Sequence, residues 1–409
     1  MKIIIAGAST YGVKNTGDDA MLQVLCSELK HTLNNPKIVF LARHPEKKFD
    51  KYFGIKSIKN IEFNNNKEST GKFFYGFNPN DSHEHIKNII DEIKKSDLVI
   101  IGGNSFMEYS ENEFLRGVTS YSSMIATLAL LHNKPFVLYG VNGHSIKNNL
   151  TKQMAKFLCG NAKFVGIRDN AFKLELMNIG IKPKNLKVFT DPAFGLIPIN
   201  NSTIGKKILK DENIPLDHKF AGVCFRHLYS KWSDQEFEKY AIKLAASCDY
   251  IVEKLNLNII FIPNCIYQSG HPNEDDRKIS IYIKNKMKHK SRTHVIMGDL
   301  SVNERLSLFP LLEFVVSNRR HVTIFSAIHN IPFLTLGYEF NWHFDNLISD
   351  LKMGEYYVNI KNCNSKLINK KIEEVFYNRE KISMKLKKII PKFNKKALYE
   401  VKTISELLK

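Results

Sequence analysis

Short apolar runs rich in isoleucine and valine alternate along the chain with longer stretches in which apolar residues recur at helical spacing. Runs that are apolar at every position are typical of strands buried on both faces of a parallel sheet, and the longer stretches indicate the helices that cover it. In the first half we expect strands at 2–6, 37–42, 97–101, 136–140, 163–167 and 186–189, and helices at 18–33, 84–95, 116–132, 149–159 and 169–178. This alternation predicts an α/β domain.

The alternation pauses at 191–205 (DPAFGLIPINNSTIG), where two prolines and two glycines predict an interdomain linker. It then restarts, with strands expected at 219–224, 258–262, 294–297, 313–316 and 333–336 and helices at 234–255, 274–288, 301–309, 321–328 and 341–351. We therefore predict an N-terminal domain over 1–195, a second domain over 196–354 and a cleft between them. Ligands of such sheets bind beyond the carboxyl ends of the strands.

The remaining segment, 355–409, is predicted to be a basic helical extension, with fourteen Lys and Arg against six Glu. Ile382, Leu386, Ile389 and Ile390 share one face of a helix that also carries lysines. Such a helix fits two interpretations, contact with anionic lipid or packing on the domains with a solvated lysine face; packing is preferred. Another segment, 56–82, is rich in Asn and Lys and predicts a long, mobile loop.

Composition narrows the class of protein. The 409 residues are 43% hydrophobic and 11% aromatic, which excludes a disordered polycation, and 60 Lys and Arg against 41 Asp and Glu give a net charge of +19. That charge favours an anionic partner: nucleic acid, an acidic membrane or a phosphorylated small molecule. The basic residues are spread out and no nucleic-acid module is visible, so nucleic acid is not expected.

The apolar and cysteine patterns indicate where the protein works. The longest apolar runs reach about half of the roughly 20 residues that a membrane-spanning helix needs. The N-terminal run is too short for a signal peptide. None of the six cysteines forms a C-x-x-C pair, so buried, reduced thiols are expected. We expect a soluble, cytoplasmic protein whose membrane contact, if present, is peripheral.

Three strands of the first domain run into glycine turns. The first turn continues into Asn15-Thr-Gly17-Asp18; it is neither a dinucleotide fingerprint nor a P-loop, and Asp18 also suits the start of a helix. The others contain Gly102-Gly103 and Gly140-Val-Asn-Gly143. Glycine lets a ligand or another backbone come close, so the three turns together predict a binding rim.

Arginines follow two strands of the second domain. Strand 219–224 leads to Arg226, and strand 313–316 leads to Arg319-Arg320-His321 at the start of a helix. Arginine binds carboxylate or phosphate through paired hydrogen bonds, a helix N-terminus adds positive charge, and histidine donates protons near neutral pH. The cluster predicts a site for an anion with two charged ends, although surface ion pairs would use the same residues. In 271–277 a metal site is less favoured than capping by Asn273, with acids in the first helical turn.

These motifs resemble the polysaccharide pyruvyl transferase family. The matches are Asn15-x-Gly17-Asp18, Ile101-Gly102-Gly103, GIRDNAFKLELMNIG (166–180), VFTDPAF (188–194) and Arg319-x-His321 before FSAIHNIPFLTLGYEF (325–340). The resemblance implies two Rossmann-like α/β domains in a GT-B-like arrangement. It also implies transfer of pyruvate from phosphoenolpyruvate to two hydroxyls of a sugar, forming a ketal. The sugar would belong to a cell-envelope glycan or its lipid-linked precursor.

The resemblance also assigns roles. Arg226, Arg319, His321 and the backbone of Arg320 would hold phosphoenolpyruvate, a co-substrate; no other cofactor and no metal is expected. His321 would be the acid and Asp18 would orient or deprotonate the acceptor. The remaining expected substrate-binding residues are Asn15, Gly17, Gly102, Gly103 and Glu108.

Two departures from the family pattern lie on the predicted acceptor side. Asn104 replaces a usual glycine, with Glu108 near the position of a usual aspartate, and Asn142-Gly-His-Ser145 replaces Gly-Ile-Gly-Pro. They indicate an unusual acceptor or an altered activity. The alternative enzyme is a GT-B-like glycosyltransferase that uses a nucleotide sugar, but no acidic residue for a donor ribose can be identified.

Overall fold

The computed structural model describes most of the chain. The described residues are 1–7, 14–61, 84–103, 105–106, 118–143, 146–182, 184–227, 233–266, 275–337, 342–361 and 363–409. They form two compact units. Unit 1 comprises Met1–Val13, Asp18–Gly195 and Phe393–Lys409, and unit 2 comprises Lys14–Gly17 and Leu196–Lys392. The predicted C-terminal extension is thus divided between the units, and a four-residue piece near the N-terminus belongs to unit 2.

Unit 1 is built on a parallel sheet in the order β3-β2-β1-β4-β6-β7-β8, with β5 paired to β6. Its strands are β1 (Lys2–Ala6), β2 (Lys37–Ala42), β3 (Lys56–Lys59), β4 (Leu98–Gly102), β5 (Ser105–Phe106), β6 (Phe136–Gly143), β7 (Phe164–Ile167) and β8 (Leu186–Val188). The helical elements are α1 (Thr16–Thr32), α2 (Lys47–Phe53), α4 (Glu84–Lys94), α5 (Val118–Leu131), α6 (Asn149–Asn161), α7 (Asn170–Asn178) and η2 (Pro192–Gly195). The strand order turns back at β1 and β4, as in doubly wound folds.

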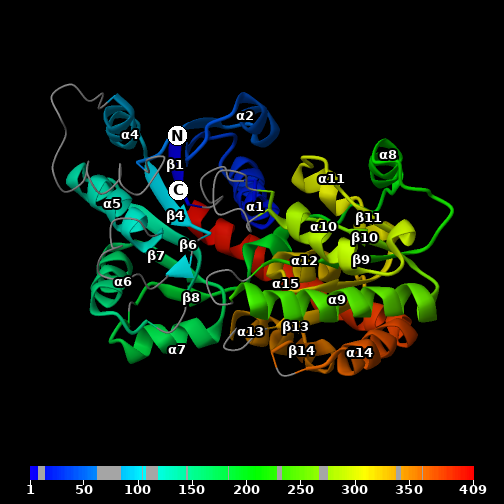
Figure 1. Ribbon diagram of the computed structural model, residues 1–409. Coiled ribbons are helices and arrows are strands. Elements are labelled where there is room, and N and C mark those ends of the chain that lie inside the picture. Colours follow the sequence, from blue (N-terminus) through cyan, green and yellow to red (C-terminus); the bar gives the residue numbers. More distant parts are fainter. Residues whose placement is uncertain are drawn as a thin grey trace. The chain divides into compact units, whose positions relative to one another are not determined.

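Alternate residues of these strands face opposite layers of helices. Ile3 and Ile5 of β1 join a core with Leu25 of α1 and, from the far end of the chain, Val401 and Ile404. The intervening Ile4 is equally buried, as are Ile89 of α4 and Ile125 of α5. In Figure 1 the end of the last helix, in red, lies against the strands of unit 1. Both faces of the sheet are therefore covered, which explains why its strands are apolar throughout.

Unit 2 has a second parallel sheet, in the order β11-β10-β9-β12-β13-β14. Its strands are β9 (Phe220–Cys224), β10 (Asn258–Phe261), β11 (Thr293–Val295), β12 (Leu312–Ser317), β13 (Phe333–Gly337) and β14 (Tyr357–Asn359). Its helical elements are α8 (Thr203–Asp211), α9 (Asp234–Leu255), α10 (Asp276–Lys286), η4 (Lys290–Arg292), α11 (Val302–Leu306), η5 (Phe309–Leu311), α12 (Arg320–Ile328), α13 (Trp342–Asp350), η6 (Gly354–Tyr356), α14 (Ser365–Tyr377) and the start of α15 (Arg379–Glu406). Capping boxes at Ser233–Glu236 and Ser301–Glu304 fix the starts of α9 and α11.

The strands and helices predicted from periodicity are confirmed, with shifted ends. The prediction of a loop over 56–82 is wrong at its start, because Lys56–Lys59 pairs with β2 as an edge strand; residues 62–82 lie outside the described part. Helix α8 begins inside the predicted linker, at Thr203. The predicted helix 301–309 is two short elements, α11 and η5, with Pro310 at the start of the second.

The basic C-terminal helix is packed, as the preferred interpretation predicted. Ile382 and Leu386 of α15 are fully buried and Ile390 nearly so, whereas Lys387 and Lys388 are exposed. Within the described ranges, no helix combines the length and the apolar character that crossing a membrane requires. All six cysteines are buried and none forms a disulfide, as predicted.

Arg168 of the GIRDNAF motif ties together the strand ends of unit 1. Its Nε donates to the Gly140 carbonyl at 2.6 Å, and its Nη2 donates to the Gly103 carbonyl at 3.0 Å. Its Nη1 lies 2.9 Å from Asp191 of the TDPAF motif, and both side chains are buried. The GIRDNAF and TDPAF motifs, two of those that resemble the family, therefore hold the backbone of the glycine turns in place through Arg168.

Replacing Arg168 with methionine should lower the free energy of unfolding by about 3–5 kcal/mol, because the buried Asp191 would lose the positive charge beside it. Urea unfolding measures the change. The double variant Arg168→Met/Asp191→Asn removes the uncompensated charge and should recover much of the loss. A single variant within about 1 kcal/mol of wild type, as for an exposed pair, would contradict this role.

Glu400 of α15 reaches the same region of unit 1. Its Oε1 accepts the Gly140 N–H at 2.7 Å, and a Cβ added to Gly166 would lie only 1.9 Å from that oxygen. Glycine at 166 thus makes room for the carboxyl group. Burial raises the pKa of Glu400 to about 8, although the Gly140 N–H and Arg168 act in the opposite direction.

This pKa makes the stability depend on pH. The folded state favours the protonated form of the Glu400 carboxyl. The contribution of this group to folding stability is therefore complete below its unfolded pKa of about 4.5, and it is lost as the pH rises towards 8. Glu400→Gln, which stays neutral, should gain stability over wild type between pH 5 and pH 8.5, by a few kcal/mol at about 1.4 kcal/mol per pKa unit. Urea unfolding at several pH values tests this, with exposed Glu406→Gln as the control. Parallel curves for wild type and Glu400→Gln would refute it.

Candidate functional site

The glycine turns of unit 1 have a packing reason. A Cβ on Gly102 would lie 2.1 Å from the Tyr139 carbonyl oxygen, and Gly103 donates to that oxygen at 2.8 Å with a positive φ of 69°. Only glycine allows β4 and β6 to approach so closely here. Binding by Gly102 and Gly103 stays a prediction, and Asn104, Glu108 and His144-Ser145 lie outside the described residues.

The Asn15-x-Gly17 motif, placed by the sequence analysis in the N-terminal domain, is attached to unit 2. Asn15 forms an antiparallel bridge with Cys265, and its side-chain oxygen accepts from Asn264 Nδ2 at 3.2 Å. The backbone of Asn264 and Ile266 completes the pairing, through Thr16 N to Asn264 O at 3.0 Å and Ile266 N to Lys14 O at 3.2 Å. Asn15 thus forms an isolated β-bridge beyond the end of β10, directly before α1 begins at Thr16.

Gly17 brings this motif against the Arg-x-His motif. A Cβ on Gly17 would lie 1.9 Å from His321 Nδ1, so His321 occupies the space that a side chain would need. His321 is the second residue of α12, and its ring stacks on Phe325 at 6.3 Å between centroids. Position 17 therefore requires glycine, because any larger side chain would collide with the imidazole of His321. One interpretation expected Asp18 to cap a helix. Helix α1 starts at Thr16, so Asp18 is instead a half-buried residue of its first turn.

Arg319 is anchored by a carboxylate, Asp276, that was predicted to lie in the first turn of a helix. Its Nη2 donates to Oδ1 of the fully buried Asp276. Burial alone would lower the pKa of Arg319, but the neighbouring Asp276 raises it above its ordinary value, so the guanidinium remains charged. Asp275 is the N-cap of α10 and accepts the Arg277 N–H at 3.0 Å; Asn273, the predicted cap, lies outside the described residues.

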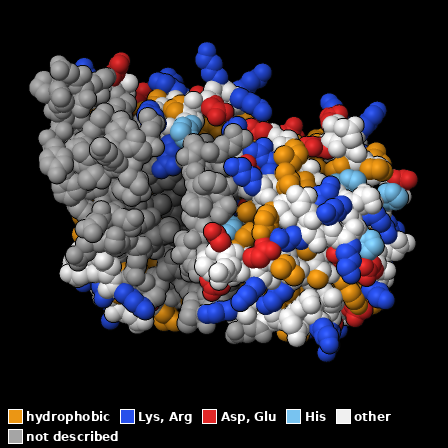
Figure 2. All heavy atoms as spheres, in the orientation of Figure 1, with side chains coloured by type: hydrophobic (Ala, Val, Ile, Leu, Met, Phe, Trp, Pro, Cys, Tyr) orange, Lys and Arg blue, Asp and Glu red, His pale blue; other side chains and the backbone are white. Residues whose placement is uncertain are grey.

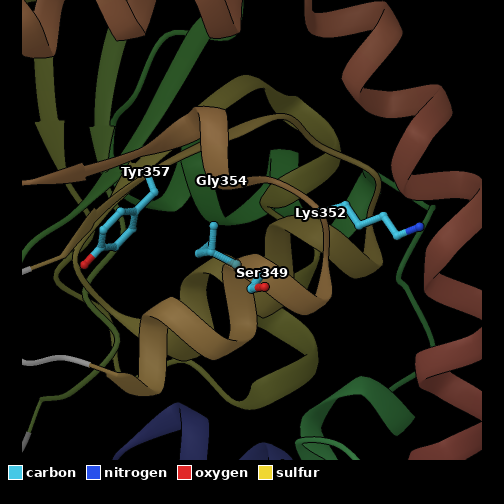
Figure 3. Close-up of a pocket in the computed structure, with 5 residues that line it drawn as sticks. Ser349, Lys352, Gly354 and Tyr357 are labelled. Carbon is cyan, nitrogen blue, oxygen red and sulfur yellow. The ribbon is translucent and has the colours of Figure 1, made fainter.

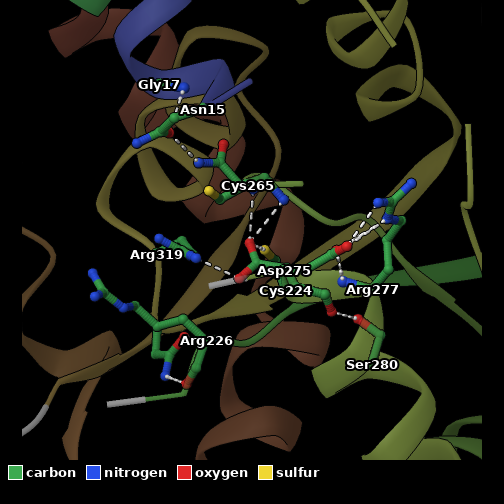
Figure 4. Close-up of polar contacts among 12 residues, drawn as sticks. Asn15, Gly17, Cys224, Arg226, Cys265, Asp275, Arg277, Ser280 and Arg319 are labelled. Atoms are coloured by element: carbon green, nitrogen blue, oxygen red, sulfur yellow. Dashed lines mark hydrogen bonds and ion pairs between the residues drawn. The ribbon is translucent and has the colours of Figure 1, made fainter. Parts of the chain in front are cut away.

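Arg226 is held by Asn318, which sequence reasoning missed. Asn318 Oδ1 accepts the Arg226 N–H at 2.8 Å, and Asn318 Nδ2 donates to the Arg226 carbonyl at 3.2 Å. This pair ties the end of β9 to the end of β12. In Figure 4 the guanidinium groups of Arg226 and Arg319 extend to the same side of the cluster. No local signal separates Asn318 from an ordinary turn residue.

The arrangement suits an anion with two charged ends. Arg319 and Arg320 stand at the start of α12, where the helix dipole adds positive charge, and Arg226 is tied to the same strand end through Asn318. Asp276 pairs with one of these three cations, Arg319. His321 follows Arg320 in the first turn of the same helix. Across the described ranges, no group of three or more His, Cys, Asp or Glu side chains could hold a metal ion.

Unit 2 also has an open pocket of about 460 Å³ that is distinct from this cluster. Ile348, Ser349, Lys352, Gly354 and Tyr357 line it (Figure 3). None of them was predicted as a site residue. The pocket lies at the end of α13 and the start of β14, whereas the arginines follow β9 and β12.

Solved structures of low sequence identity share this fold. UDP-GlcNAc 2-epimerase from Neisseria meningitidis is similar with a TM-score of 0.63, 13% identity and coverage of 100% of both chains. HepE from Anabaena, solved with UDP-glucose, has a TM-score of 0.60 at 12% identity and covers 100% of this chain and 99% of its own. A glycosyltransferase from Rickettsia africae has a TM-score of 0.58 at 13% identity, with coverage of 100% and 98%. A comparison with curated proteins finds no match.

The chain folds into two Rossmann-like α/β domains, and its structural relatives share this fold. The protein therefore belongs to the GT-B fold class, as predicted. A family model described as polysaccharide pyruvyl transferase matches residues 15–339. The chain therefore belongs to the polysaccharide pyruvyl transferase family and is a transferase.

Proposed function

We propose that the protein transfers pyruvate from phosphoenolpyruvate to two hydroxyls of a sugar in a cell-envelope glycan or its lipid-linked precursor. The observation that carries this proposal is that, in a member of this family, Arg319 and His321 start α12 and Arg226 is joined to the same strand end through Asn318. Phosphoenolpyruvate carries a phosphate and a carboxylate on a three-carbon frame. Two guanidinium groups and a helix N-terminus match those two charges.

In the proposed reaction, His321 donates a proton to the methylene carbon of phosphoenolpyruvate. The adjacent carbon gains oxocarbenium character and is attacked by a sugar hydroxyl, with Asp18 orienting that hydroxyl or taking its proton. The carbon–oxygen bond to phosphate then breaks and phosphate leaves with the bonding electrons. A second hydroxyl closes the ketal and gives its proton to the neutral His321, which restores the acid. Arg226 and Arg319 stabilise the charge on the departing phosphate.

The proposed acceptor places the enzyme in the cytoplasm, at the inner face of the plasma membrane. The exposed lysines of α15 support a weak, peripheral attraction to anionic lipid, since its apolar face is already used in packing. Figure 2 shows Lys and Arg side chains dispersed over the described surface of one face of the molecule. Such a distribution gives solubility and a general attraction for anions.

Mass spectrometry of envelope glycans tests the function. Cells that express the wild-type gene should carry pyruvate ketals on a glycan or lipid-linked sugar, and deletion should remove them. Wild type should restore them, and His321→Ala should not. If deletion removes a sugar residue and leaves the pyruvate content unchanged, the glycosyltransferase alternative would be favoured instead. That alternative is a second candidate because HepE, which has a similar fold, was solved with a nucleotide sugar.

A further inference from the structure

We infer that Asp276 is a positioning residue for the anion site: it sets the orientation of Arg319 and joins that arginine to the Asn15-x-Gly17 motif. This inference rests on the proposed function, in which Arg319 binds phosphoenolpyruvate. Asp276 is the first residue of α10, where an exposed acidic residue would be enough to favour the helix N-terminus. Instead its side chain is fully buried and turned away from its own helix.

Each carboxylate oxygen of Asp276 has a separate task. Oδ1 accepts from Arg319 Nη2. Oδ2 accepts the backbone N–H groups of Asn264 at 3.0 Å and Cys265 at 2.9 Å. Hydrogen bonds to an ionised acceptor are about twice as strong as neutral ones, so the two ends of this bridge are firmly coupled.

The backbone that Asp276 fixes is the same backbone that receives the N-terminal motif. Asn264 and Cys265 pair with Asn15 and Thr16, and Gly17 follows directly, with the ring of His321 above it. Figure 4 shows this line of contacts from Gly17 and Asn15 through the Cys265 segment to Arg319. Asp276 therefore sets where Arg319 lies relative to His321, along a route that does not pass through α12.

The charge balance leaves part of the site for a ligand. Arg305 of α11 is 1% exposed, and Asp276 acts on it as well as on Arg319. Among the described residues, Nε and Nη1 of Arg305 and Nε of Arg319 have no hydrogen-bond acceptor. Asp276 and Asp299 both act on Arg305, and Asp276 also accepts from Nη2 of Arg319, so Asp276 orients Arg319 while Nε of that arginine has no acceptor in the described part of the chain. A buried donor without an acceptor is costly, and an anionic ligand would satisfy it.

The test measures phosphoenolpyruvate binding by calorimetry for wild type, Asp276→Asn, Arg319→Met and the double variant. Asp276→Asn should weaken binding by at least 10-fold. If Asp276 affects binding through Arg319, the loss in the double variant should stay close to that of Arg319→Met alone and well below the product of the two single losses. Asp275→Asn is the matched control: it removes the N-cap of α10 and the partner of Arg277 but no contact of Arg319, and should bind as wild type does.

Several outcomes would overturn the inference. They are wild-type affinity in Asp276→Asn, equal losses in Asp276→Asn and Asp275→Asn, or losses that multiply in the double variant. If Asp276→Asn fails to fold because Arg319 is left buried and unpaired, the double variant lacks both charges and should fold and bind like Arg319→Met. Failure of wild type itself to bind phosphoenolpyruvate would count against the proposed function, which separates the two claims.

Discussion

Replacing Gly17 with alanine should lower kcat/KM for phosphate release from phosphoenolpyruvate by about 100-fold or more, since a displacement near 1 Å at a reacting group can cost that much. The added Cβ would lie 1.9 Å from Nδ1 of His321, and 2.4 Å from its Cγ. The imidazole must move, because the α1 backbone is held by the hydrogen bonds of Thr16 and Asn15. The assay uses an envelope glycan fraction as the acceptor.

Gly160→Ala is the matched control for this substitution. Gly160 lies in α6, and a Cβ there meets nothing within 4 Å. Alanine should stabilise that helix by up to about 1 kcal/mol and leave activity unchanged. Full activity in Gly17→Ala would show that the position of His321 does not matter for the reaction.

His321→Ala should reduce the maximal rate of pyruvate transfer by about 100- to 10,000-fold, the usual contribution of a positioned acid or base. Binding of phosphoenolpyruvate should weaken less than kcat falls, because the arginines still hold the phosphate and the carboxylate. Single-turnover measurements of phosphate release separate the two effects.

The control for His321→Ala is His218→Ala, a partly exposed histidine of unit 2 whose ion-pair partner is Asp217. It should retain wild-type activity. If His321→Ala changes only the affinity for phosphoenolpyruvate and not kcat, His321 binds the donor and another group supplies the proton.

Local sequence patterns predict most of this fold because they report burial directly. Apolar runs such as KIIIA at 2–6 are strands because both faces of each sheet are covered, and these elements were identified with small errors at their ends. Strand β3 was missed because it is short and lies at the edge of its sheet, with only partly buried residues. Edge strands have weak periodicity.

The structure of the candidate site was less predictable because its contacts join distant parts of the chain. Arg226, Arg319 and His321 could be predicted as site residues from their places after strands. The pairing of Asn15 with Cys265 and the contact of Gly17 with His321 could not, since neither has a local period. Asp276 was predicted to lie in the first turn of a helix, and it does, next to the N-cap Asp275. That position alone does not indicate that its side chain is buried against Arg319.

Glu400 shows the same limit in unit 1. In the sequence it is one charged residue of a basic amphipathic helix, where a solvated position is expected. In the structure it is fully buried because Gly166 leaves space for it and Gly140 donates to it. A glycine and a glutamate more than 200 residues apart carry no signal of each other in a single sequence.

Titration of the purified protein with phosphoenolpyruvate tests the central claim most directly. Wild type should bind it saturably, and Arg319→Ala should bind about 10- to 100-fold more weakly, as expected for loss of a hydrogen bond to a charged group. UDP-glucose, titrated in parallel, should give no saturable signal. Binding of UDP-glucose but not of phosphoenolpyruvate, or equal affinity for phosphoenolpyruvate in wild type and Arg319→Ala, would contradict the assignment of this cluster as the donor site.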